Sequence, residues 1–252
     1  MELREALFNY LLRIGDSSLI SGQRFAEWVS NGPSLEEDIA LTNIGLDLIG
    51  QARAALTYAA EIEGKGRTED DLAYFRNERE YYNTLLSELP NGNFADSMAK
   101  FFLSAAFSYH FYKDLGKSKD EKLAAFALKS LKEVTYHLRH TGEWVIRLGD
   151  GTQESKEKIQ GAFDAIWMFT GDLFEMNEVD ESLIEMEIGV DLKDIKRNWD
   201  ETVNEVFKRA TLVRPKDAFM QTGRLKAQHT EYLGHILTEL QYLQRAYPGL
   251  KW

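Results

Sequence analysis

The chain has 252 residues, a formal net charge of −11 and no cysteine. The acidic charge argues against a nucleic-acid partner, and the lack of thiols excludes disulfides, thiolate nucleophiles, iron–sulfur clusters and cysteine-bound zinc. Residues 101–112, the longest uncharged run, are fewer than the ~20 residues that a membrane helix needs. The first residues also lack a secretory h-region, so we expect a cytoplasmic protein without membrane contact.

Helical spacing of apolar residues recurs along almost the whole chain. The predicted helices cover residues 2–14, 19–29, 35–62, 72–89, 94–115, 119–148, 154–174, 191–211 and 227–245. Their predicted capping residues are Ser34, Thr68, Asn93, Ser118, Thr152 and Asp191. A break is expected at residues 16–18, the segment 72–89 is expected to be exposed, and residues 175–190 receive no firm assignment.

The predicted fold class is all-α. No strand–helix alternation, glycine-rich phosphate loop or Gly-x-Ser-x-Gly elbow is present. The four longest predicted helices, which would form a four-helix bundle, cover residues 35–63, 94–115, 119–148 and 153–174. The remaining helices would flank this bundle, and no linker composition divides the chain, so we expect a single helical domain over residues 1–252.

The helix over 119–148 has a regular apolar stripe that passes near a histidine. The stripe consists of Ala127, Leu131, Val134, Leu138, Thr141, Val145 and Leu148. His137 lies at its edge, three residues after Val134 and four after Glu133. In carboxylate-bridged di-iron bundles, a Glu and a His at this i, i+3 spacing form half of the metal site. Here the glutamate position holds Val134, which cannot bind metal.

The helix over 35–62 repeats this arrangement. Asp47 precedes Leu48, and Gln51 follows three residues later on the buried face. Gln51 and His137 are interpreted as buried polar groups that hydrogen-bond to neighbouring helices, rather than as metal ligands. The sequence therefore predicts two degenerate half-sites, at Leu48 and Gln51 and at Val134 and His137, with no metal, catalytic or cofactor-binding residue in this chain.

Two other functions stay open from the residues alone. Glu231 and His235, at i, i+4, are candidates for a metal or acid–base element, which would make the chain a metal-dependent helical-bundle enzyme. Basic residues near the carboxy end are candidates for contacts with the phosphates of coenzyme A, which would suit a homo-oligomer that binds acyl-CoA without chemistry. These residues are Arg214, Lys216, Arg224, Lys226 and Arg245.

Several segments together resemble one protein family. They are LEEDIALTNIGLDLIGQARAALTYAAEIEG (35–64), PNGNFAD (90–96), KEVTYHLR (132–139), HTEYLG (229–234) and LQYLQR (240–245). Nearly the whole chain is similar to the PaaC family, the structural subunits of the bacterial phenylacetyl-CoA 1,2-epoxidase complex. The resemblance implies a ferritin-like fold, a role in aerobic phenylacetate catabolism and no catalysis by this chain alone.

The resemblance also implies partners and cofactors that belong to the complex. The partners are a homologous di-iron catalytic subunit of the PaaA type, a small further subunit and a reductase, with a homodimer as an open arrangement. Di-iron, O2 and NADPH-derived electrons are cofactors of the complex and not of this chain. The two Glu-x-x-His motifs of the catalytic relative fall on 48–51 and 134–137, where only His137 is retained.

Overall fold

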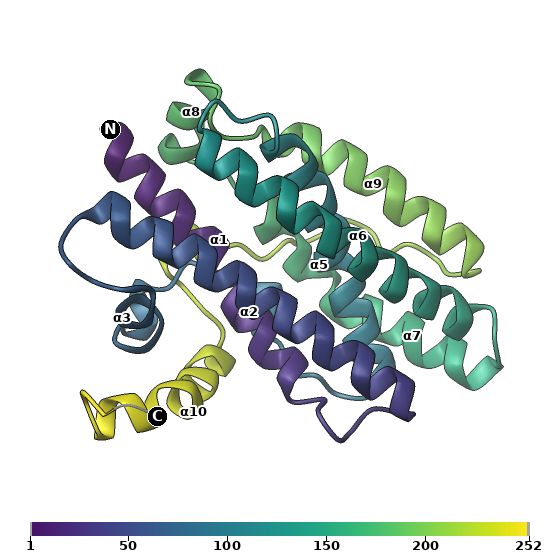
Figure 1. Cartoon of the computed structure of the whole chain (residues 1–252). Helices are drawn as coiled ribbons and strands as arrows, with labels where there is room; N and C mark the ends of the chain where they lie inside the picture. The colour runs from purple at the N-terminus through teal and green to yellow at the C-terminus, as the bar shows by residue number, and fades with distance from the viewer. Residues whose placement is uncertain (1, 251–252) are drawn as a thin grey trace. The chain divides into compact units, whose positions relative to one another are not determined.

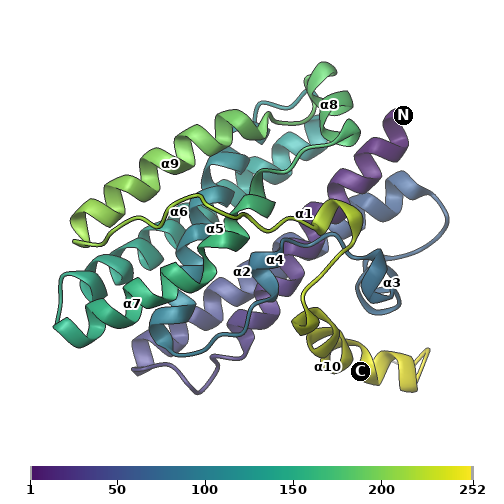
Figure 2. The same cartoon turned by 180° about the vertical axis from the view of Figure 1, so that it is seen from behind.

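The computed structural model describes residues 2–250, which are shown from opposite sides in Figure 1 and Figure 2. Its contacts divide the chain into two compact units, Met1–Leu89 with Gly223–Trp252 (unit 1) and Pro90–Thr222 (unit 2). Helices and turns, but no strands, make up residues 2–250, and the all-α, ferritin-like fold class is confirmed. None of the helices in this range has the length and apolar character needed to cross a bilayer. The single domain over 1–252 stays a prediction.

Two long helices, α1 (Leu3–Ala26) and α2 (Leu35–Glu63), form the body of unit 1 and lie side by side (Figure 1). Glycines let them approach closely, because a Cβ at Gly22 would lie only 2.8 Å from the Ile49 side chain. Ser34 caps α2 by accepting a hydrogen bond from the backbone N–H of Glu37, as predicted. Gly64 ends α2 with φ 64°, a left-handed conformation that suits glycine.

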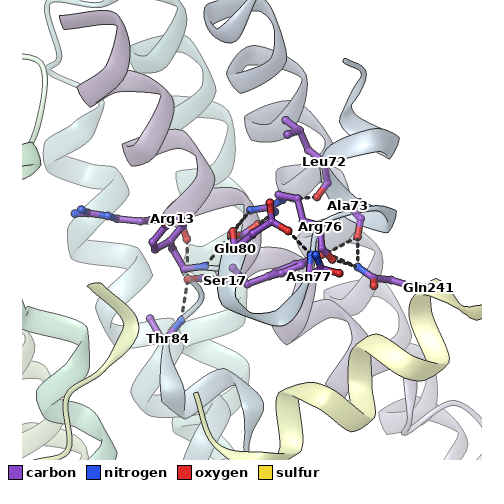
Figure 3. A network of polar contacts seen from close by, with 12 residues as sticks. Arg13, Ser17, Leu72, Ala73, Arg76, Asn77, Glu80, Thr84 and Gln241 are labelled. Carbon is purple, nitrogen blue, oxygen red and sulfur yellow. Dashed lines mark hydrogen bonds and ion pairs between the residues drawn. The ribbon is translucent and has the colours of Figure 1, made fainter. Parts of the chain in front are cut away.

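The break predicted at residues 16–18 is wrong, because α1 continues through it. Asp16 is buried and forms an ion pair with Arg76. The Ser17 hydroxyl donates to the carbonyl oxygen of Arg13 (2.8 Å) and accepts from the N–H of Thr84 (3.2 Å; Figure 3). Polar side chains that would compete with a helix in isolation therefore have partners here.

The single exposed helix predicted over 72–89 is also wrong. Thr68 forms the predicted capping box with Asp71, but the helix that follows, α3 (Glu69–Tyr74), is short. A 3₁₀ turn, η1 (Glu78–Glu80), and one helical turn, α4 (Leu85–Glu88), come next, and residues 83–89 are buried. The guanidinium of Arg76 explains the early end of α3, because it donates to the Leu72 carbonyl (2.6 Å) and to that of Glu80 (2.7 Å).

The carboxy-terminal part of unit 1 contains η3 (Arg224–Lys226) and α10 (Glu231–Ala246). The predicted helix over 227–245 therefore begins four residues later than expected. Ala227 has φ 49° and ends η3 in the left-handed region, which interrupts the helical path. The residues between it and α10 make tertiary contacts that are described below.

Unit 2 is built on α5 (Phe94–Leu115) and α6 (Glu121–Gly149), with α7 (Gln153–Ile166) and α9 (Leu192–Arg209) packed on α5. Asn93 caps α5 in a capping box with Asp96, and Thr152 caps α7, both as predicted. Aromatic side chains fill the core, where the rings of Phe163 and Phe207 lie 4.5 Å apart.

Three boundaries in unit 2 differ from the prediction. Asp120, rather than Ser118, caps α6 by accepting from the N–H of Leu123 (2.8 Å), while the Ser118 hydroxyl accepts from the N–H of Asp120. The helix predicted to reach residue 174 ends as the 3₁₀ segment η2 (Trp167–Phe174), where the Thr170 hydroxyl donates to the Trp167 carbonyl. The unassigned segment 175–190 contains a helix, α8 (Glu178–Glu185), capped by Asn177.

The four longest helices are consequently α1, α2, α5 and α6, two in each unit. The predicted fourth member of the bundle, 153–174, supplies only 14 regular residues as α7, whereas α1 has 24. Unbroken α1 and shortened α7 follow from the tertiary hydrogen bonds at Ser17 and the local one at Thr170, which amino-acid type alone does not reveal.

Candidate functional site

The structure buries the polar ends of both predicted half-sites, each within its own unit. On α2, Gln51 is 3% exposed and Leu48 is half-buried. On α6, Val134 and His137 are 1% and 3% exposed. His137 lies within the buried stripe rather than at its edge, because steps of four and three lead from Ser130 through Val134 to it.

The donor set at these positions does not suit a di-iron centre. Such a centre takes carboxylates and histidines from facing helices, whereas Leu48 and Val134 have no donor atom. The flanking acids, Asp47 and Glu133, are half-buried. Within residues 2–250, no group of three or more His, Asp or Glu side chains is placed to hold a metal ion. That this chain binds no metal stays a prediction.

The alternative candidates near the carboxy end do not form a ligand site either. Glu231 and His235 are both exposed on α10. Arg245 donates to the carbonyl oxygens of Tyr74 (3.2 Å) and Arg76 (2.8 Å). In unit 2, Arg214 is likewise occupied by an ion pair with Asp200 at 2.6 Å.

The other basic candidates lack a common surface. Arg224 is buried, whereas Lys216 and Lys226 are exposed. Together with the engaged Arg214 and Arg245, these positions give no basic face that is free for a phosphate within either unit.

Unit 1 contains a buried polar network that the sequence did not reveal. Asp16 and Arg76 are its most buried members, and the Asp16 carboxylate also accepts from the N–H of Tyr82 (2.9 Å). Burial by itself would lower the pKa of Arg76, but proximity to Asp16 outweighs it, so that this pKa is raised. Gln241 of α10 then donates to the Ala73 carbonyl (3.2 Å), the Arg76 carbonyl (3.0 Å) and the Tyr81 hydroxyl (3.0 Å; Figure 3).

Glu88 is the second centre of this network. One of its carboxylate oxygens, Oε1, accepts from His229 Nδ1 (2.5 Å) and from Asn83 Nδ2 (2.9 Å). The other, Oε2, accepts from the backbone N–H and the hydroxyl of Thr230, at 2.7 and 2.6 Å. These contacts hold the start of α10 on the segment 83–88 of the same unit.

The histidine in this cluster is an imidazolium. His229 Nε2 lies 2.9 Å from the Tyr81 carbonyl, and Nδ1 faces the Glu88 carboxylate, so that both ring nitrogens must donate. Burial alone would lower the pKa of His229, but the hydrogen bond and the charge of Glu88 raise it above its ordinary value. The cluster joins residues 141 positions apart in the chain. A sequence signal for it was present only as the isolated His229 and the single acid near the end of 72–89.

Fold and site together define a ferritin-like helical protein whose half-site positions hold apolar side chains and whose most elaborate polar cluster is structural. Its affiliation is more specific than that class. The family model described as "Phenylacetic acid catabolic protein" matches residues 1–252, so the chain belongs to this family. The resemblance seen in the sequence is thereby confirmed.

A curated relative from Escherichia coli (strain K12) is similar over almost the full length. It is the C component of the 1,2-phenylacetyl-CoA epoxidase, which is 46% identical over 243 residues, or 96% of this chain and 98% of the relative. Identity at this level across the whole length indicates the same fold from end to end.

Proposed function

We propose that this chain is the non-catalytic structural subunit of a multicomponent phenylacetyl-CoA 1,2-epoxidase in aerobic phenylacetate catabolism. It pairs with and stabilises the homologous di-iron catalytic subunit. The full-length similarity to a protein named as one component of that epoxidase supports membership of the complex. The family match over residues 1–252 supports the same conclusion.

The observation that carries the non-catalytic role is the side chain at the centre of the buried face of α6. Val134 is enclosed there, three residues before His137, and offers no ligand atom. A di-iron centre supplies O2 activation where it is bound, and the residues of this chain do not fit one. The chain therefore contributes packing surface to the complex, and the chemistry belongs to its partner.

The other components follow from the same proposal. A reductase delivers NADPH-derived electrons, and the assembly also includes a small further subunit. All of these components operate in the cytoplasm. The absence of a helix able to cross a membrane within residues 2–250 is compatible with this location.

Reconstitution with and without this chain tests the proposal. The catalytic subunit, small subunit and reductase are supplied with phenylacetyl-CoA, O2 and NADPH, and epoxide formation is followed. We expect turnover to require this chain, while the chain alone gives none. Full turnover in its absence would contradict the structural role.

Metal content provides a second, independent readout. The purified chain is loaded anaerobically with ferrous iron and desalted, and iron is then quantified. We expect a value near zero, against the ~2 irons per chain of a di-iron bundle. Stoichiometric iron that is lost in His235→Ala would instead favour a metalloenzyme.

A further inference from the structure

α2 presents an apolar face to solvent. Leu35, Ile39 and Leu46 are 72%, 53% and 64% exposed, and their spacing places them on one side of the helix. Between Glu36 and Arg53, the other exposed residues are Asn43 and Gly50. Every exposed residue over about four turns is therefore uncharged, whereas a solvated helix face ordinarily carries charges.

The other long helix with a fully described exposed face, α6, shows the usual pattern. Its exposed charged residues are Glu121, Lys122, Lys129, Lys132, Arg139 and Arg147. The apolar face of α2 is thus a particular property of that helix and marks it as a contact surface.

The shape of this α2 face is complementary to itself. If a second α2 packs antiparallel, with the two-fold axis between residues 44 and 45, each large side chain meets a small or polar one. The opposed pairs are Leu35 with Ala54, Ile39 with Gly50, and Leu46 with Asn43. A Cβ at Gly50 would have no atom within 4 Å, so the space over this glycine is open to an incoming side chain.

Charge selects the same register. The antiparallel arrangement places Glu36 opposite Arg53 of the second copy, and symmetry repeats this pair at the other end. Arg53 remains largely exposed although its Nε donates to Glu69 (3.2 Å). A parallel arrangement would instead bring Glu36 against Glu36 and Arg53 against Arg53, which is repulsive.

We propose that this face of α2, defined by Leu35, Ile39, Asn43, Leu46, Gly50 and Ala54, is a homodimer interface that pairs two copies of this chain antiparallel. The homodimer goes beyond the role in the epoxidase complex. Its failure leaves the reconstitution result untouched, because the dimer is measured on this chain alone.

Light scattering of the full chain after size exclusion gives the first test. We expect a mass of twice 28.9 kDa, and we expect Leu46→Glu to raise the dissociation constant about tenfold or more. Leu128→Glu is the matched control, since Leu128 is an exposed leucine on α6 and its replacement should leave the dimer intact. Unchanged helicity by circular dichroism shows that each variant is folded. A wild-type monomer at every concentration would overturn the proposal.

Charge reversal tests the register. Glu36→Arg and Arg53→Glu should each weaken the dimer, and the two together should restore it, because the opposed charges are exchanged across the two-fold axis. Additive weakening in the double variant would contradict the proposed register.

Disulfide trapping tests the polarity, since the chain has no cysteine of its own. Ile39→Cys with Gly50→Cys should give a cross-linked dimer under mild oxidation. Either single variant should not, because identical positions lie about 16 Å apart along the helix axis in the antiparallel pair. Cross-linking of a single variant would overturn this arrangement. The proposal also falls if Leu46→Glu leaves the mass unchanged and abolishes co-elution with the catalytic subunit, since that subunit would then occupy the face.

Discussion

Val134 shows how one side chain can distinguish a packing subunit from a metal-binding one. Because it is 1% exposed, Val134→Glu would bury a carboxylate without the metal that compensates it in a di-iron bundle. We expect the free energy of unfolding to fall by about 3 kcal/mol or more, as measured by urea denaturation. Thr135→Glu is the control, because Thr135 is exposed on the same helix. Equal effects of the two variants would contradict the placement of Val134 in the core.

His229 predicts a pH dependence of stability. Its pKa is raised in the folded protein above the ordinary value of 6.5. As the pH rises above 6.5, the unfolded chain loses this proton first, so the folded state binds more protons and the free energy of unfolding falls. The stabilisation is complete below 6.5 and is lost as the pH passes the raised pKa.

Unfolding by urea at a series of pH values measures this effect. His229→Gln should remove the downward slope above pH 6.5, since no group at this position then titrates. His235→Gln is the matched control, because His235 is exposed on α10 and its replacement should retain the slope. The interpretation fails if the slope survives in His229→Gln.

At the scale of elements, the buried ion pair of Asp16 and Arg76 fixes where α1 and α3 run. Removing one partner leaves a buried charge uncompensated, so Asp16→Asn should lower the free energy of unfolding by about 3–5 kcal/mol. The comparison is Glu154→Gln, which breaks an exposed pair with Lys158 and should have a much smaller effect. Thermal or urea denaturation of both variants checks this, and similar losses would contradict the buried placement.

Local signals in the sequence were sufficient for the starts of several helices and insufficient for their ends. Ser34, Thr68, Asn93 and Thr152 cap helices as predicted, because a cap depends on residues only three positions apart. The segment 72–89 could not be predicted in the same way. Its path depends on Arg76, whose partner Asp16 is 60 residues away.

The candidate site was predictable to a similar extent. Helical periodicity correctly buried Val134 and Gln51, since burial of a helix face follows from spacing. The cluster of Glu88, His229 and Thr230 was missed because its members come from distant segments, and a lone histidine carries no periodic signal.

At the scale of the whole molecule, unit 1 is discontinuous and unit 2 is continuous in sequence. We expect a fragment of residues 90–222 to fold alone, because its helices and aromatic core are all encoded within it. A fragment of residues 1–89 should not, since it would bury Glu88 without His229 and Thr230. Circular dichroism with cooperative thermal melting distinguishes the outcomes. A cooperative melt of 1–89, or none for 90–222, would contradict this expectation.

Unit 1 needs both of its chain segments in order to fold. Adding residues 223–252 as a separate polypeptide to 1–89 should restore a cooperative melt, because the Gln241 and His229 contacts are then available. Thr230→Val in the added polypeptide is the matched variant, and it should restore less, since it removes the hydroxyl that donates to Glu88.

The bond between Glu88 and His229 also sets the order of events on the ribosome. Residue 88 leaves the exit tunnel long before residue 229 has been translated. At ~5–20 residues per second, the intervening 141 residues take on the order of ten seconds. During this interval the nascent amino-terminal segment has an unpaired glutamate and an uncovered apolar surface, while residues 90–222 can already fold. The newborn chain therefore depends on chaperones most at its amino-terminal end, and this dependence ceases only when the last helix emerges.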